Sequence, residues 1–114
     1  GGMYVDIGCG TGKPVFAAAL LHDFDVCLGI EILEGLHGIC TKVLRKWNEV
    51  GDLLPAHKMS TDVRFVHGDA TVLDWSAADV VFANSTCFDD QLMKSLALKS
   101  EDLRTGAFVI TTTR

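Results

Sequence analysis

An acidic residue followed by three glycines at alternate positions stands near the start of the chain: Asp6, Gly8, Gly10 and Gly12. Glycine lets a backbone turn sharply and lets a ligand approach main-chain N–H groups without meeting a Cβ atom. A short apolar segment precedes these glycines, and Pro14, which suits the first turn of a helix, follows them. Open α/β sheets hold nucleotide-like cofactors at such a turn between strand and helix. The motif therefore predicts a cofactor site.

Two more carboxylates follow where a nucleotide-binding sheet needs them. Glu31 ends the apolar segment 26–30, and it follows the glycines by about 20 residues, the distance at which an acidic side chain binds ribose hydroxyls. Asp69 follows the apolar segment 63–67 and Gly68. Ligands of open α/β sheets bind at the carboxyl ends of the strands, so we expect the carboxylates to meet at one edge. The alternative is a tight turn flanked by solvated acids.

The hydrophobic pattern alternates strands and helices along the whole chain. We expect strands over 3–7, 25–30, 62–67, 78–83 and 107–112, helices over 13–22, 33–50 and 89–99, and a loop over 51–61. Such alternation predicts an α/β fold, a parallel sheet in the order 3-2-1-4-5 with helices on both faces. The second helix is expected to bury one apolar face: Leu33, Leu36, Cys40, Val43, Trp47 and Val50. Gly35 and Gly38 weaken its start, so a start beyond them is the alternative.

Composition narrows the class of protein. A length of 114 residues allows one domain, and no apolar run reaches the roughly 18 residues of a membrane span. The net charge of −5 does not indicate the basic surface that binding to nucleic acid requires. The cysteines, at positions 9, 27, 40 and 87, have no C-x-x-C spacing, so we expect neither a metal site nor disulfides, and a reducing compartment, cytosol or nucleus. The scattered histidines are assigned no catalytic role.

The spacing D-x-G-x-G-x-G resembles motif I of the class I S-adenosylmethionine-dependent methyltransferases, which share a Rossmann-like fold. The resemblance implies S-adenosylmethionine as the cofactor, Glu31 as the residue that binds its ribose and Asp69 as the residue that binds the adenine amino group. The cofactor-binding residues that it implies are Asp6, Gly8, Cys9, Gly10, Thr11, Gly12, Glu31, Ile32, Gly68, Asp69, Ala70 and Asn84.

The segment after the fourth expected strand narrows the resemblance. Asn84 is followed four residues later by Phe88, and the stretches Gly29-Ile30-Glu31 and Leu44-Arg45-Lys46-Trp47 stand earlier in the chain. Together these features resemble the Dot1 family of histone H3 lysine methyltransferases. Asn84 and Phe88 are then the expected catalytic residues, with Phe88 as the wall of a channel that strips water from the lysine. Asn84 as the N-cap of the third helix is the alternative.

The same resemblance implies histone H3 in a nucleosome as the partner and the nucleus as the location. Two residues depart from the family pattern: Ala70 stands where an aromatic residue is usual, and Lys13 where a neutral amide is usual. Class I methyltransferases continue with sixth and seventh strands, and Dot1 proteins carry an upstream segment over the cofactor. We therefore expect residues 1–114 to form one partial methyltransferase domain that binds the cofactor weakly and does not methylate lysine alone.

Two other functions stay open at this point. One is an S-adenosylmethionine-dependent methyltransferase that acts on a small molecule or RNA, for which a cytoplasmic location is the alternative. The other is a non-catalytic nucleotide-binding domain, for example for a nicotinamide dinucleotide. The G-x-G-x-G spacing argues against the second, because dinucleotide folds carry G-x-G-x-x-G.

Overall fold

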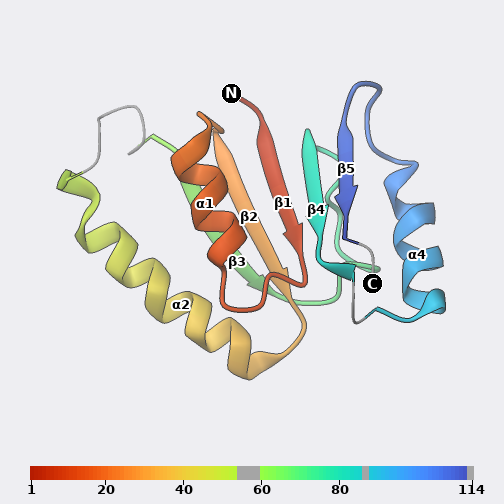
Figure 1. Ribbon diagram of the computed structural model, residues 1–114, viewed down its shortest axis with the longest axis horizontal. Helices are drawn as coiled ribbons and strands as arrows, with labels where there is room; N and C mark the ends of the chain where they lie inside the picture. The colour runs from red at the N-terminus through yellow and green to blue at the C-terminus, as the bar shows by residue number, and fades with distance from the viewer. Residues whose placement is uncertain (54–59, 86–87, 113–114) are drawn as a thin grey trace.

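A computed structural model describes residues 1–53, 60–85 and 88–112 of the chain. Strands and helices alternate along these residues (Figure 1). The strands are β1 (Met3–Ile7), β2 (Val26–Glu31), β3 (Asp62–His67), β4 (Val80–Ala83) and β5 (Phe108–Thr111). The helices are α1 (Lys13–Leu21), α2 (Glu34–Glu49) and α4 (Asp90–Ser100), and a 3-10 turn covers Gly51–Leu53. Part of the expected loop, residues 54–59, lies outside the described residues.

The five strands form one parallel sheet in the order β3-β2-β1-β4-β5, which confirms the expected topology. β1 is central, and it pairs with β2 on one side and with β4 on the other. All strands run in the same direction, so their carboxyl ends lie together at the lower edge of the sheet in Figure 1. The strand order reverses beside β1, and ligands of open α/β sheets bind at this position.

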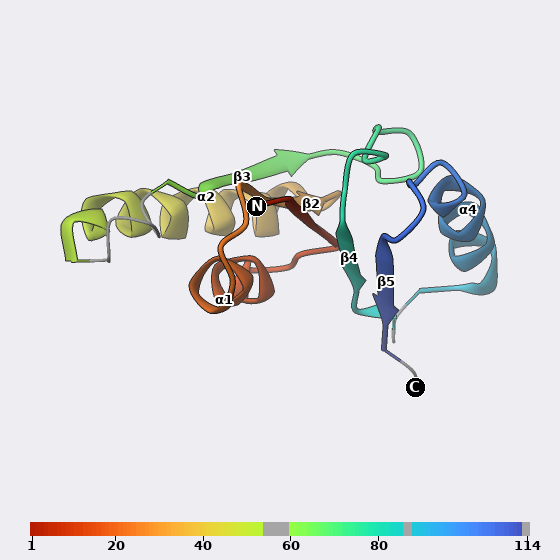
Figure 2. The same ribbon diagram turned by 90° about the horizontal axis from the view of Figure 1, so that it is seen from above.

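Helices cover both faces of the sheet, as expected. Val5 and Ile7 of β1 face the side on which Leu96 of α4 packs, together with the buried Trp75. Tyr4 faces the opposite side, where α1 and α2 contribute Val15, Ala19 and Cys40. Figure 2 shows α1 and α4 on opposite sides of β4 and β5. Burial of these apolar side chains on both faces holds the glycine turn and the strand ends in place.

α2 covers nearly the expected range but buries less of its apolar face. It begins at Glu34, so Gly35 and Gly38 lie inside the helix and the alternative of a start beyond them is wrong. Three residues of the expected buried face are largely exposed: Leu33 (59%), Val43 (37%) and Val50 (45%). Cys40 is buried, and Leu44 and Trp47 pack against the core in their neighbourhood. A narrower strip of α2 is therefore covered than the sequence pattern predicts.

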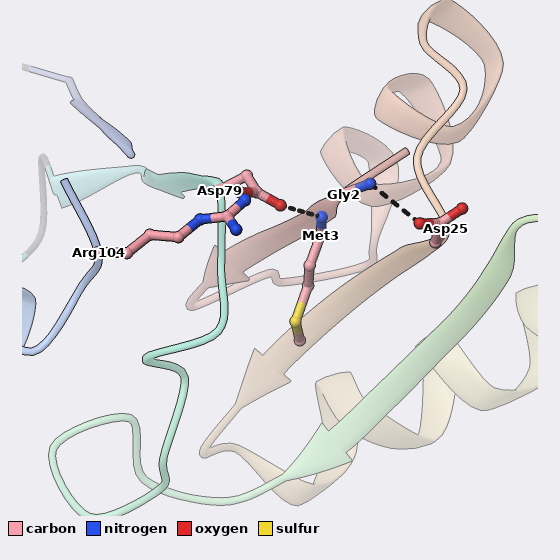
Figure 3. Close-up of polar contacts among 5 residues, drawn as sticks. All are labelled: Gly2, Met3, Asp25, Asp79 and Arg104. Carbon is pink, nitrogen blue, oxygen red and sulfur yellow. Dashed lines mark hydrogen bonds and ion pairs between the residues drawn. The ribbon is translucent and has the colours of Figure 1, made fainter. Parts of the chain in front are cut away.

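Two aspartates hold the amino end of β1, far from the expected cofactor site (Figure 3). The Gly2 N–H donates a hydrogen bond of 3.1 Å to the Asp25 carboxylate before β2. The Met3 N–H donates one of 2.7 Å to Asp79 before β4, and Arg104 forms an ion pair with the same carboxylate. The central strand is thus fixed to both neighbouring strands by side chains as well as by the sheet ladder.

Candidate functional site

The glycine turn begins where β1 ends. The N–H groups of Gly8 and Cys9 donate to the carbonyl oxygen of Ile30 at 2.8 and 3.1 Å, so the turn stays beside β2. Gly8, Gly10 and Gly12 have φ angles of +70°, +58° and +91°, a region that side chains rarely adopt. A Cβ atom at Gly12 would also lie 2.8 Å from the Phe65 ring. The alternate glycines are therefore required by the backbone of this turn.

The Glu31 carboxylate joins the turn to the end of β2. It is 5% exposed and accepts hydrogen bonds from the Gly10 N–H at 2.8 Å and the Leu33 N–H at 3.0 Å. An ionised carboxylate has about four acceptor positions, so these two bonds leave capacity for further donors. Glu31 is thus a carboxyl group held in place at the carboxyl edge of the sheet, where its sequence position puts it.

A cavity of about 540 Å³ opens at this edge. Its volume falls within the range of about 300–1,000 Å³ that is usual for small-molecule sites. The lining includes these expected site residues: Gly8, Gly10, Glu31, Ile32, Gly68, Asp69, Ala70, Asn84 and Phe88. Four other expected residues do not line it: Asp6, Cys9, Thr11 and Gly12. The structure therefore brings the carboxyl ends of β1, β2, β3 and β4 together around one cavity.

Asp69 and Ala70 form the part of the cavity that follows β3. The Asp69 carboxylate accepts hydrogen bonds from the Thr71 N–H (2.9 Å) and hydroxyl (2.7 Å), and both bonds hold the pKa of Asp69 below its usual value. The Ala70 carbonyl accepts a bond of 2.8 Å from the Trp75 indole. Asp69 is therefore an anion on the cavity wall. Trp75 fixes the backbone beside it.

Asn84 and Phe88 lie on the opposite wall. The Thr112 hydroxyl donates a hydrogen bond of 2.8 Å to the Asn84 side-chain oxygen, which orients the amide. The Phe88 ring lies against the backbone of Gly8, because a Cβ atom there would be 3.1 Å from the ring edge. Asp89 caps α4 by accepting from the Leu92 N–H at 2.7 Å. The sequence alternative in which Asn84 caps this helix is therefore wrong.

Behind the cavity lies a buried cluster of acidic and thiol groups. Asp6 is 1% exposed, and neither of its carboxylate oxygens has a hydrogen-bond partner among the described residues. Burial, and secondly the negative charge of Glu31, raise the pKa of Asp6 to about 7.

Two thiols belong to the same buried cluster. The Cys9 and Cys40 sulfur atoms are 3.9 Å apart, and burial raises the pKa of both thiols. The Cys40 thiol donates a bond of 2.9 Å to the Gly10 carbonyl.

Several residues of the site were missed by the sequence argument. Leu33 and Leu36 at the start of α2 and Leu92 at the start of α4 line the cavity. Each lies at or just before the start of a helix that begins at the carboxyl edge of the sheet, and this position was the available signal. Thr112 directly follows β5, so it lies at the same edge of the sheet, where it orients Asn84.

The electrostatics of the cavity favour a cation with an apolar body. Glu31 and Asp69 are acidic, and among the described residues no lysine, arginine or histidine lines the cavity. Most of the remaining lining is aliphatic or aromatic. Within the described part of the chain, no group of three His, Cys, Asp or Glu side chains could hold a metal ion. Helices long and apolar enough to cross a membrane are likewise absent from the described residues.

Several solved structures with the same fold are methyltransferases. The RNA methyltransferase of Salinibacter ruber, crystallised with S-adenosyl-L-homocysteine, is 24% identical, with a TM-score of 0.75 over 99% of this chain and 66% of that chain. A S-adenosylmethionine-dependent methyltransferase of Thiobacillus denitrificans, also with S-adenosyl-L-homocysteine, is 19% identical, with a TM-score of 0.65 over 97% and 41%. Phosphoethanolamine N-methyltransferase 1 of Haemonchus contortus is 19% identical, with a TM-score of 0.70 over 95% and 21%.

At these identities the likeness shows the fold, and the expected methyltransferase fold is confirmed. The chain spans less than two thirds of the length of each of these three structures. No curated protein sequence matches the chain. The family model of the histone methylation protein DOT1 matches residues 1–114, the whole of the sequence, and the chain therefore belongs to the DOT1 histone methylation family.

Proposed function

We propose that this chain is the cofactor-binding core of a S-adenosylmethionine-dependent methyltransferase whose substrate is a lysine of histone H3. The observation that carries the cofactor part is the contact between Glu31 and Gly10, which joins the second strand end to the glycine turn at 2.8 Å. Family membership supports the histone part. A histone substrate implies work on chromatin in the nucleus.

The residues present suit the cofactor in four ways. Glu31 retains acceptor capacity for the two ribose hydroxyls beside its two N–H partners. Asp69 follows β3 as an anion and would accept from the adenine amino group. The glycines leave main-chain atoms uncovered, and a Cβ atom at Gly10 would meet no protein atom within 4 Å. The acidic wall suits the positive charge of a sulfonium.

When bound, S-adenosylmethionine supplies a methyl group that its positively charged sulfur has already activated, so the protein contributes position and exclusion of water. A lysine amine must arrive without its proton. Apolar side chains that remove water from an ammonium group lower its pKa. Phe88 and Leu92 line the cavity and would form that wall, and Asn84, held by Thr112, would orient the amine.

Cofactor binding is tested by calorimetry of the 114-residue chain with S-adenosylmethionine and, in parallel, with a nicotinamide dinucleotide. We expect weak binding of the first and none of the second. Preference for the dinucleotide would refute the methyltransferase assignment and favour the alternative of a non-catalytic nucleotide-binding domain.

The substrate is tested with the full-length gene product and radiolabelled S-adenosylmethionine on nucleosomes, free histone H3, total RNA and a small-molecule extract. We expect label on a histone H3 lysine, located by mass spectrometry. Asn84→Ala and Phe88→Ala should each lower this transfer at least about tenfold, while the control Asn48→Ala, on the exposed side of α2, should not. Label on RNA or small molecules alone would support the second function, which the Salinibacter ruber fold relative favours.

A further inference from the structure

Hydrogen bonds of Thr112, the residue that follows β5, join it to the end of β4. Its backbone N–H donates to the Ala83 carbonyl at 3.3 Å, and its carbonyl oxygen accepts a bond from the Ser85 hydroxyl. Its own hydroxyl oxygen accepts from the Ser85 N–H at 3.0 Å and donates to the Asn84 side-chain oxygen at 2.8 Å. The position of the Thr112 hydroxyl is therefore fixed before this group reaches Asn84.

The bond between Thr112 and Asn84 contributes direction more than stability. Asn84 is exposed, so water can replace Thr112 as its hydrogen-bond partner, and the bond adds little to the free energy of unfolding. The backbone bonds of Thr112 join β4 to β5 whatever side chain stands at this position. What the hydroxyl adds is the orientation of the Asn84 amide, with its oxygen held at Thr112. Because Asn84 lines the cavity, this orientation is set at the cavity wall.

The orientation of an amide matters to a nucleophile beside it. An amide has an acceptor end, the oxygen, and a donor end, the NH2 group. A neutral lysine amine has two N–H bonds and one lone pair. The lone pair must point at the methyl group, where the N–C bond forms while the sulfur keeps the electron pair of the C–S bond. An acceptor holds the amine by an N–H and leaves the lone pair uncovered, whereas a donor competes for the lone pair.

The oxygen of Asn84 has the capacity for this role. An amide oxygen accepts two hydrogen bonds, and the Thr112 hydroxyl supplies one of them. The Ser85 N–H occupies a lone pair of the same hydroxyl and so helps to direct its hydrogen at Asn84. Without the hydroxyl, this bond no longer distinguishes the two ends of the amide.

We propose that Thr112 is a positioning residue for methyl transfer: its hydroxyl holds Asn84 so that the amide oxygen accepts an N–H of the substrate amine. This inference rests on the proposed function and deepens it, because the site then suits a nucleophile that keeps an N–H after it has lost its proton. Thr112 acts through Asn84 and does not touch the substrate. Its loss leaves the amine bound but directs the lone pair at the methyl group less often, so kcat falls while KM changes little.

The test is a double-mutant cycle in the full-length gene product, with radiolabelled S-adenosylmethionine and nucleosomes. Thr112→Val removes the hydroxyl and keeps the shape of the side chain, so kcat should fall about tenfold, the effect of one hydrogen bond, with KM changed less than about twofold. In the Asn84→Ala background the same substitution should change kcat less than about twofold, because there is no amide to orient. Thr112→Ser keeps the hydroxyl and should retain most of the activity. Thr111→Val, at the neighbouring exposed threonine of β5, is the matched control and should keep the wild-type kcat.

Three results would overturn the inference and leave the proposed function intact. Equal losses from Thr112→Val in the two backgrounds, or an equal loss from Thr112→Ser, would show that Thr112 acts through packing alone. A higher KM with unchanged kcat would assign Thr112 to substrate binding. Thermal denaturation checks the fold of each variant, and Thr112→Ala replaces the valine variant in the cycle if that variant does not fold. Absence of transfer to lysine by the wild-type protein would overturn the proposed function and this inference with it.

Discussion

The Cys40 thiol of α2 donates a hydrogen bond of 2.9 Å to the carbonyl oxygen of Gly10, the glycine at the middle of the turn. The N–H of the same glycine donates to Glu31. Both polar groups of one backbone residue are thus held by side chains from different elements. The turn is positioned by α2 and β2 together, and not by its own glycines alone.

Removal of the thiol should therefore disturb the turn. Cys40→Ala deletes a buried side chain and the donor to Gly10, so we expect the free energy of unfolding to fall by about 1–2 kcal/mol. S-adenosylmethionine affinity, measured by calorimetry, should fall as well. Cys27→Ala is the matched control, because Cys27 is equally buried, in the part of β2 that pairs with Tyr4 of β1. Equal losses of affinity in the two variants would show that Cys40 acts through packing alone.

Glu31 should be the side chain whose loss most harms cofactor binding. Hydrogen bonds to a charged group contribute about 1.5–3 kcal/mol, so Glu31→Ala should weaken S-adenosylmethionine binding on the order of 10- to 100-fold. Glu31→Gln keeps one acceptor and should fall between wild type and Ala. Glu34→Ala, in the exposed first turn of α2, is the control and should bind normally. If the Glu31 and Glu34 variants bind alike, the ribose assignment has to be abandoned.

Asp6 makes the stability of the chain depend on pH. The acid stays protonated in the folded protein up to about pH 7, while the unfolded chain loses this proton near pH 4. The contribution of Asp6 to the free energy of unfolding therefore falls as pH rises from about 4 to 7, by up to about 1.4 kcal/mol per pH unit, and does not change above pH 7. In urea titrations, the stability of Asp6→Asn relative to the wild type should increase over this range. A stability difference that does not vary between pH 4 and 7 would contradict the raised pKa.

The contacts of Asp79 at the amino end of β1 should differ in strength (Figure 3). Asp79→Ala leaves the Met3 N–H without its side-chain acceptor, which should cost about 1–3 kcal/mol of unfolding free energy. Arg104→Ala removes only an ion pair to an exposed guanidinium, which should cost less than about 1 kcal/mol. Thermal or chemical denaturation of both variants decides the order, and a larger loss for Arg104→Ala would contradict it.

Gly38 offers a stabilising substitution. It lies inside α2, and a Cβ atom there would meet no atom within 4 Å. Gly38→Ala should therefore raise the free energy of unfolding by about 1 kcal/mol, the difference in helix propensity. Gly29→Ala is the contrasting control, since its Cβ would lie 2.7 Å from the Phe65 ring and 2.9 Å from the Cys9 sulfur. Destabilisation by both substitutions would mean that α2 needs a glycine at position 38.

The sequence predicted the sheet better than it predicted the helices. The bounds of β1 and β3 match the expected segments, since apolar runs that end in glycine or an acid are unambiguous. Val43 was expected to be buried from helical spacing, yet it is 37% exposed. α2 packs mainly against β3, the edge strand of the sheet, so its neighbours cover only a narrow strip of the helix. Spacing alone does not show how much of a helix its neighbours cover.

The side-chain contacts of the site could not be read from the sequence. The Thr112 contact with Asn84 joins residues 28 positions apart, and the Cys40 contact with Gly10 joins residues 30 positions apart. Each depends on which elements become neighbours at the carboxyl edge of the sheet. Residue type could predict Glu31 and Asp69 because carboxylates at strand ends have a known role. A threonine or cysteine in the same region can equally be a packing residue, so its type does not predict a contact in the site.

The central place of β1 has a consequence for the order in which the protein is built. During synthesis β1 is the first of the five strands to appear, yet Tyr4 pairs with Val80, which is synthesised much later. One edge of the most buried strand therefore stays open until β4 has left the ribosome. Pairings between such distant segments form slowly, and open edges invite wrong partners. The half of the cavity formed by Asn84 and Phe88 is completed last.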